Sequence, residues 1–182
     1  MCDLIELHNC VTQTFSYSFI KNYERSVRRM NIQDLFLNQC RKGKAEVTLF
    51  LTIGVPMKGK IVHFDQHSLT IELEKQNQQA LIYKHAILSI QPKVPLAITS
   101  SQKLGMDLKQ NEMLSHCVTK KIHVELYLMN GKKFEGAISH FDTYTVILNL
   151  VDRKQILIFK HGISTIIPKE KIHLSPAKPK LN

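Results

Sequence analysis

The sequence has few cysteines and lacks the motifs that mark many enzymes. Its four cysteines include no C-x-x-C pair, which argues against a zinc ribbon or a thioredoxin-type site and favours a reducing compartment. No G-x-S-x-G motif and no phosphate-binding glycine loop is present. These absences predict a protein that is not an enzyme and that needs no metal or cofactor.

Long apolar runs are also missing. No segment approaches the roughly 18 apolar residues that a membrane-spanning helix requires. The first ten residues carry Asp3 and Glu6 and no basic residue before their apolar part, which argues against a secretory signal. We therefore expect a cytoplasmic protein without a membrane partner.

Acidic residues are outnumbered by basic ones. The chain has 25 Lys and Arg against 15 Asp and Glu, a formal net charge of +10. A small protein this basic usually binds polyanions, meaning nucleic acid or an anionic membrane surface. Plain solubility is the alternative explanation of the charge. Without a membrane-binding segment, the charge favours nucleic acid.

The chain contains an internal repeat. The segment His63-Phe64-Asp65 returns as His140-Phe141-Asp142, and Leu81-Ile82-Tyr83-Lys84-His85 returns as Leu157-Ile158-Phe159-Lys160-His161. The offset is 77 residues for the first pair (63 to 140) and 76 for the second (85 to 161). A one-residue insertion or deletion between the two motifs therefore predicts a loop there.

Each copy has the pattern of one helix followed by short strands. Asn31 and Asp34 resemble a capping box, and apolar residues follow at helical spacing. Alternating residues then predict strands over 47–53, 58–64, 69–74, 81–85 and 87–90 in the first copy, and over 124–129, 133–141, 146–150, 155–160 and 164–167 in the second. This order predicts a mainly β protein of two small, bent, five-stranded barrels, each with an N-terminal helix.

The repeat divides the chain into five parts. We expect domains over 30–92 and 107–168, joined by a linker over 93–106 that is rich in small residues. The basic segment 169–182 is predicted to be a mobile tail, and residues 1–29 form an N-terminal extension that matches neither copy.

Several of these motifs resemble the Hfq family, bacterial RNA chaperones with an Sm-type barrel. Residues 31–42 are similar to the opening helix of that family, and Tyr83-Lys84-His85-Ala86-Ile87 to its second Sm motif, normally Y-K-H-A-I-S. In the second copy, residues 159–165 carry the same pattern. The resemblance covers 31–92 and 107–168 and indicates a tandem Hfq. It implies RNA binding and a six-membered ring, which three two-copy chains would complete.

The resemblance also implies which residues bind RNA. In that family uridine-rich 3′ ends bind in a pore on the helix-bearing, proximal face. The matching positions are Gln33, Gln66, His67, Lys84 and His85, then Gln110, Thr143, Tyr144, Lys160 and His161. A flat ring stacks on a base, an amide or hydroxyl reads its edge, and a cation holds phosphate. The alternative is that the Lys-His pairs only end a strand at the surface.

Two further faces carry candidate residues by the same resemblance. A rim that promotes strand annealing corresponds to Asn38, Arg41, Lys42 and Phe64, and to Lys120, Lys121 and Phe141. The distal face, which binds adenosine-rich RNA in the family, corresponds to Phe50, Gly54 and Met57, and to Tyr127, Asn130, Gly131 and Phe134. A Gln of the family pattern is Ala80 here and Ile156 in the second copy, so Phe50 and Tyr127 are equally explained as packing residues.

The expected partners are uridine-rich single strands, small regulatory RNAs and messenger RNAs, together with further copies of the chain. Two positions depart from the family pattern, since His67 stands where Phe is usual and Thr143 where Gln is usual. A ring-forming scaffold that binds protein partners is the alternative function. Steep salt dependence would distinguish RNA binding from such a scaffold.

Overall fold

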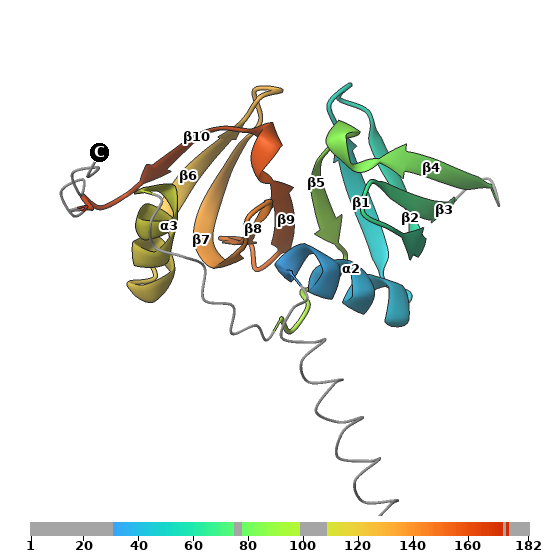
Figure 1. The fold of residues 1–182 in the computed structure, drawn as a ribbon, viewed down its shortest axis with the longest axis horizontal. Coiled ribbons are helices and arrows are strands. Elements are labelled where there is room, and N and C mark those ends of the chain that lie inside the picture. Colours follow the sequence, from blue (N-terminus) through green and yellow to red (C-terminus); the bar gives the residue numbers. More distant parts are fainter. Residues whose placement is uncertain (1–30, 75–77, 99–108, 173, 175–182) are drawn as a thin grey trace, which may run out of the picture.

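The computed structural model describes residues 31–74, 78–98, 109–172 and 174 (Figure 1). The first repeat consists of α2 (Ile32–Lys42), β1 (Glu46–Leu51), β2 (Pro56–Phe64), β3 (Ser68–Leu73), β4 (Gln79–Tyr83) and β5 (Ile87–Pro92). The second consists of α3 (Lys109–Thr119), β6 (His123–Leu128), β7 (Lys133–Phe141), β8 (Thr145–Leu150), β9 (Gln155–Phe159) and β10 (Ile163–Pro168). The expected fold class is thereby confirmed. The N-terminal extension, most of the linker and most of the tail lie outside the described residues.

Helix α2 begins where the sequence places its cap. The Asp34 backbone N–H donates a 2.7 Å hydrogen bond to the side-chain oxygen of Asn31, which satisfies one of the helix's free amides. Phe36, Leu37 and Cys40 form its buried face. Burial raises the pKa of the Cys40 thiol to about 12, so this cysteine is an inert core residue at neutral pH.

The strand before the Lys-His pair is shorter than predicted in each repeat, and β1 ends at Leu51 where the prediction ran to residue 53. Strand β4 ends at Tyr83, and Lys84–Ala86 form a 3₁₀ turn, so the strand expected over 81–85 is wrong at its end. The same turn, Lys160–Gly162, follows β9. This difference matters because the turn places the Lys-His pair at a corner, where a regular strand would have sent the two side chains to opposite faces.

The two repeats form a single ten-stranded antiparallel sheet. Its order is β10-β6-β7-β8-β9-β5-β1-β2-β3-β4, and the repeats meet where β5 pairs with β9. Ser89 lies opposite Ile158 and Ile90 opposite Leu157 in that pairing. Figure 1 shows the helices on one side of the sheet and strands β10 and β4 at its two ends. The repeats are therefore joined edge to edge, and one edge of each is left open.

The cores of the two repeats interpenetrate at this boundary. Ile147, Leu157 and Phe159 of the second repeat belong to the apolar core of the first. Leu88 of the first repeat, only 1% exposed, belongs to the core of the second. Burial of each such side chain contributes about 1.5–3 kcal/mol. The boundary is therefore part of the folded core. Within the described residues, neither α2 nor α3 is long and apolar enough to cross a membrane.

Candidate functional site

The proposed pore residues of the first repeat are held together by backbone hydrogen bonds. The Lys84 N–H donates to the His67 carbonyl at 2.8 Å, which ties the β2–β3 turn to the 3₁₀ turn. The Asp65 carboxylate accepts from the N–H groups of His67 and Ser68, both at 2.7 Å, and from the Ser68 hydroxyl. The hydroxyl and then these amides lower the pKa of Asp65 to about 2. The turn that bears exposed Gln66 and His67 is thus rigidly shaped.

Lys84 is buried along its length. It is 8% exposed, and its Nζ lies 5.6 Å from the centre of the Phe64 ring. Burial lowers the pKa of this ammonium, while the negative charges of Asp34 and Asp65 raise it. The neighbouring His85 is exposed and stacks on Tyr83 with ring centroids 5.7 Å apart. A cation and a flat ring therefore stand side by side at this corner.

The second repeat builds the same corner with a tyrosine. The Lys160 N–H donates to the Tyr144 carbonyl at 2.8 Å, and Lys160 Nζ lies 5.4 Å from the Phe141 ring centre. Burial lowers the pKa of Lys160, and the charge of Asp142 raises it. Tyr144 is 62% exposed, and Thr143 beside it is exposed as well. An aromatic face is therefore available to solvent next to the lysine.

The boundary between the repeats adds a residue from the first repeat to the second-repeat corner. The Gln33 N–H donates a 3.0 Å hydrogen bond to the Asp142 carboxylate, so the start of α2 lies against the Thr143–Tyr144 turn. His161 Nε2 lies 3.0 Å from the Ile87 carbonyl oxygen across the same boundary. The structure thus brings Gln33 to the second repeat's corner.

The two aspartates differ because only the second-repeat corner has a helix from the other repeat packed against it. Asp142 is 1% exposed because α2 covers it, and it uses its second oxygen for Gln33. Asp65 is exposed, and its second oxygen accepts from its own turn residue Ser68. Gln110 is the second repeat's counterpart of Gln33. It is exposed on α3, away from the boundary between the repeats. Sequence reasoning missed the bridging role of Asp142, although the repeated Phe-Asp pair marked the position.

The rim residues are better assembled in the first repeat. Arg41 donates a 3.0 Å hydrogen bond to Asn38, and its guanidinium carbon lies 6.0 Å from the Phe64 ring centre. Phe64 therefore contacts both the rim arginine and Lys84. Lys42 is exposed, as are Lys120 and Lys121 after α3.

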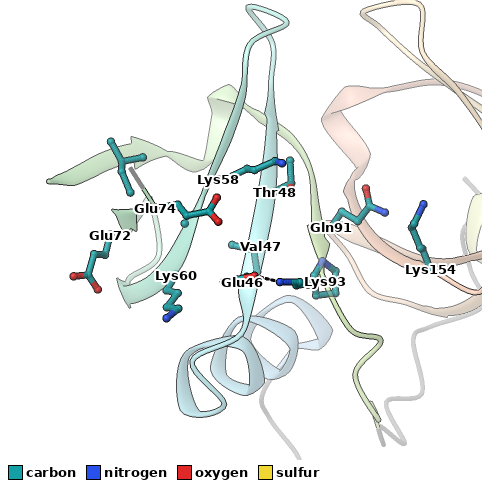
Figure 2. Close-up of a pocket in the computed structure, with 13 residues that line it drawn as sticks. Glu46, Val47, Thr48, Lys58, Lys60, Glu72, Glu74, Gln91, Lys93 and Lys154 are labelled. Carbon is teal, nitrogen blue, oxygen red and sulfur yellow. Dashed lines mark hydrogen bonds and ion pairs between the residues drawn. The ribbon is translucent and has the colours of Figure 1, made fainter. Parts of the chain in front are cut away.

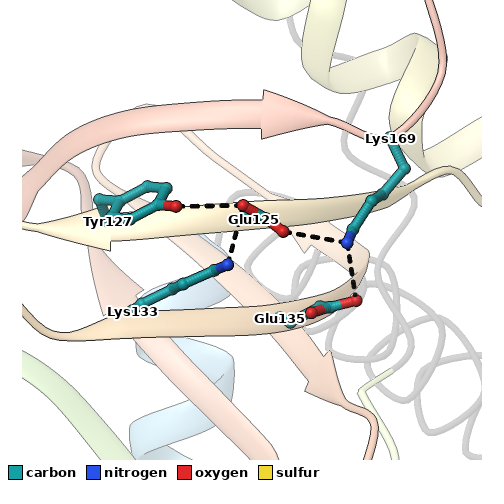
Figure 3. Close-up of polar contacts among 5 residues, drawn as sticks. All are labelled: Glu125, Tyr127, Lys133, Glu135 and Lys169. Atoms are coloured by element: carbon teal, nitrogen blue, oxygen red, sulfur yellow. Dashed lines mark hydrogen bonds and ion pairs between the residues drawn. The ribbon is translucent and has the colours of Figure 1, made fainter.

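The proposed distal residues are partly exposed and paired with lysines. Lys132 Nζ lies 4.3 Å from the centre of the Phe50 ring, a cation–π contact between the repeats. Tyr127 donates a 3.1 Å hydrogen bond to Glu125, and Lys133 lies 5.6 Å from its ring centre (Figure 3). Gly54 and Gly131 occupy turns with positive φ, whereas Met57, Asn130 and Phe134 are half-buried. In the second repeat the Tyr127 hydroxyl is thus already hydrogen-bonded to a carboxylate of the same chain.

This carboxylate makes a pH-dependent contribution to stability. Hydrogen bonds from Lys133, Lys169 and the Tyr127 hydroxyl lower the pKa of Glu125 from 4.5 to about 2. A lowered pKa stabilises the fold at pH values above 4.5, and the contribution is lost as the pH falls toward 2. In thermal unfolding, Glu125→Gln is expected to be less stable than the wild type at pH 7 and to approach it at pH 3. An unchanged difference across that range would contradict this, and Glu170→Gln controls for the loss of a negative charge.

An open cavity of about 910 Å³ lies elsewhere, over β1, β2 and the end of β5 (Figure 2). Lysines and glutamates line it, and Lys93 pairs with Glu46 at 2.6 Å. The predicted RNA-binding residues are not among those that line it.

His63 and His67 have the i, i+4 spacing that binds zinc on a helix, but here they belong to β2 and the following turn. Within the described ranges, no three His, Cys, Asp or Glu side chains are grouped to hold a metal.

Comparison with known proteins identifies the architecture. The family model for the Hfq protein matches residues 32–97 and 109–173, together more than half of the chain. RNA-binding protein Hfq of Leptospira biflexa is 50% identical over 72 residues, which span 40% of this chain and 84% of that protein. RNA-binding protein Hfq of Caldicellulosiruptor saccharolyticus is 55% identical over 67 residues, 37% of this chain and 67% of that protein.

One solved structure shows a partial likeness to the chain. The crystal structure of the pleiotropic translational regulator Hfq is 33% identical, covers 32% of this chain and 95% of its own, and has a TM-score of 0.30. The Hfq family is a non-enzymatic family. With both repeats matched separately by one family model, the chain belongs to the Hfq family.

Proposed function

We propose that this chain binds uridine-rich single-stranded RNA at its Lys-His corners and promotes pairing of small regulatory RNAs with messenger RNAs. The observation that carries the proposal is the pair of backbone hydrogen bonds from Lys84 to His67 and from Lys160 to Tyr144. Each bond holds the backbone of a ring-bearing residue next to a lysine, and the arrangement occurs twice in one chain. The names of the relatives, RNA-binding proteins, support the same assignment.

The chemistry of each corner suits an unpaired nucleotide. A base stacks on His67 or Tyr144, and the Gln33 amide reads its edge at the second corner. The ammonium groups of Lys84 and Lys160 lie 5.6 and 5.4 Å from the ring centres of Phe64 and Phe141, and they would hold the phosphate beside the base. Arg41 and Lys42 form the rim that brings a second strand close.

We further propose that three chains form a closed ring of six repeats. Leu81 and Tyr83 on the open edge of β4 are 61% and 56% exposed, whereas their counterparts Leu157 and Phe159 on β9 are 0% and 3% exposed. Strand β10 of another chain would cover β4 as β5 covers β9. Gln110 of that chain would then complete the first-repeat corner.

The test of RNA binding removes both corner lysines. The variant Lys84→Ala with Lys160→Ala is expected to lose roughly 100-fold or more in affinity for a labelled oligo-uridine, because two charge-assisted contacts per chain disappear. Fluorescence anisotropy measures the affinity, and native mass checks the assembly. The control Lys60→Ala with Lys154→Ala removes the same charge at the cavity of Figure 2. Equal losses of affinity in both variants would mean that RNA binding depends on the overall positive charge and not on the corner lysines.

A protein-binding scaffold is the second candidate function. Ile53, Val55 and Met129 are 76%, 57% and 72% exposed at the strand turns of one face, which suits an apolar partner. The salt dependence of binding separates the two candidate functions. For single-stranded RNA, the logarithm of the binding constant falls with the logarithm of the salt concentration with a slope of about −0.7 per phosphate neutralised. The cytoplasmic location stays a prediction.

A further inference from the structure

The boundary inside the chain contains a pair of residues matched in size. A β-carbon on Gly162 would lie 2.7 Å from Leu88 Cδ2 and 3.4 Å from Leu88 Cα. Leu88 is 1% exposed and packs in the second repeat's core, so its side chain has little room to move away. Any side chain in place of this glycine would therefore force the buried leucine to shift.

The open edges carry the same two positions, but there the glycine is replaced by a larger residue and the leucine by a smaller one. With the offset of 76 residues, Gly162 corresponds to Ala86 and Leu88 to Ser164. Ala86 is half-buried at the end of the β4 edge, and Ser164 is exposed on β10. In the proposed ring, Ala86, larger than its counterpart Gly162, would face Ser164, smaller than its counterpart Leu88.

We propose that these two pairs determine which repeat may lie beside which. Gly162 matches Leu88 in size and Ala86 matches Ser164, so a first repeat beside a second repeat is favoured over two like repeats side by side. This inference rests on the ring proposed above. It explains why β5 of a first repeat pairs with β9 of a second repeat, as the structure shows, and not with β4 of another first repeat.

The rule follows from the mismatched pairings. Two first repeats would place the β-carbon of Ala86 against Leu88, where a β-carbon comes within 2.7 Å of Cδ2 unless the buried leucine shifts. Two second repeats would place Gly162 against Ser164 and leave a void in the core. Overpacking and cavities both destabilise a boundary, so like repeats are rejected in either direction.

The open edges provide the first experiment. Ser164→Leu places a leucine opposite Ala86, and it is expected to convert trimers to single folded chains at concentrations where the wild type is assembled. Adding Ala86→Gly to Ser164→Leu recreates the internal pair and is expected to restore the trimer. Analytical ultracentrifugation measures the mass. Normal assembly of Ser164→Leu alone, or failure of Ala86→Gly to restore it, would overturn the rule.

The internal pair provides a second experiment that does not depend on the ring. Gly162→Ala and Leu88→Ser are each expected to lower the Tm by roughly 5 °C, and together by clearly less than the sum. Additive losses would overturn the size match. Ala86→Gly with Leu88→Ser is the control pair, expected to be additive. If the wild type proves to be a single chain, the ring is wrong and this cycle alone decides the matter, while oligo-uridine affinity is measured separately.

Discussion

Placing charges on the open edge of β4, with Leu81→Glu and Tyr83→Lys, is expected to leave a folded chain that no longer assembles. These two side chains are 61% and 56% exposed, while Leu157 and Phe159 at the same places on β9 are buried by β5. Burying two large apolar side chains contributes about 3–6 kcal/mol. Their loss should weaken association of the chains by roughly 100- to 10,000-fold.

The design keeps the net charge and has a matched control. Ile53→Glu with Val55→Lys makes the same chemical change at exposed apolar residues in the β1–β2 turn, away from both edges. Sedimentation should find single chains for the edge variant and trimers for the control and the wild type, with unchanged circular dichroism throughout. Trimers in the edge variant would remove β4 from the proposed interface.

Local features of the fold were predictable because neighbouring residues determine them. The Asn31 cap and apolar spacing predicted α2, and strand β7 covers the predicted range 133–141. The predicted end of β4 was wrong because the hydrogen bond from Lys84 to His67 joins the 3₁₀ turn to the β2–β3 turn, which is distant in sequence. Alternation in sequence carries no information about such a bond.

The contacts at the boundary between the repeats could not be predicted from the sequence. Asp65 and Asp142 follow the same Phe in the same motif, yet only Asp142 receives the start of α2. Leu157 and Leu81 are identical residues at equivalent positions, and one is buried while the other is 61% exposed. Burial at these positions depends on which edge lies next to them, and that is a property of the assembled sheet. The Lys-His corners were found because their chemistry recurs within each repeat.

The repeat also preserves a glycine that the strand pairing demands. A β-carbon on Gly136 in β7 would lie 2.1 Å from the Asn149 carbonyl oxygen and 2.9 Å from its carbon, and one on Gly59 in β2 would lie 2.2 Å from the Glu72 carbonyl oxygen. These are backbone atoms of the paired strands β8 and β3, so they cannot turn aside as a side chain would. Both glycines are buried where two backbones approach closely.

Gly136→Ala is therefore expected to separate β7 from β8 and to destabilise the chain by about 3 kcal/mol or more. For a chain of this size the Tm should fall by roughly 10 °C, and Gly59→Ala should act similarly through the first repeat. Glu135→Ala, an exposed change on the same strand, is the control and should shift the Tm by only about 2 °C. A Gly136→Ala chain that melts with the control would mean that these backbones have room for a side chain. The close approach of the β7 and β8 backbones at Gly136 would then be contradicted.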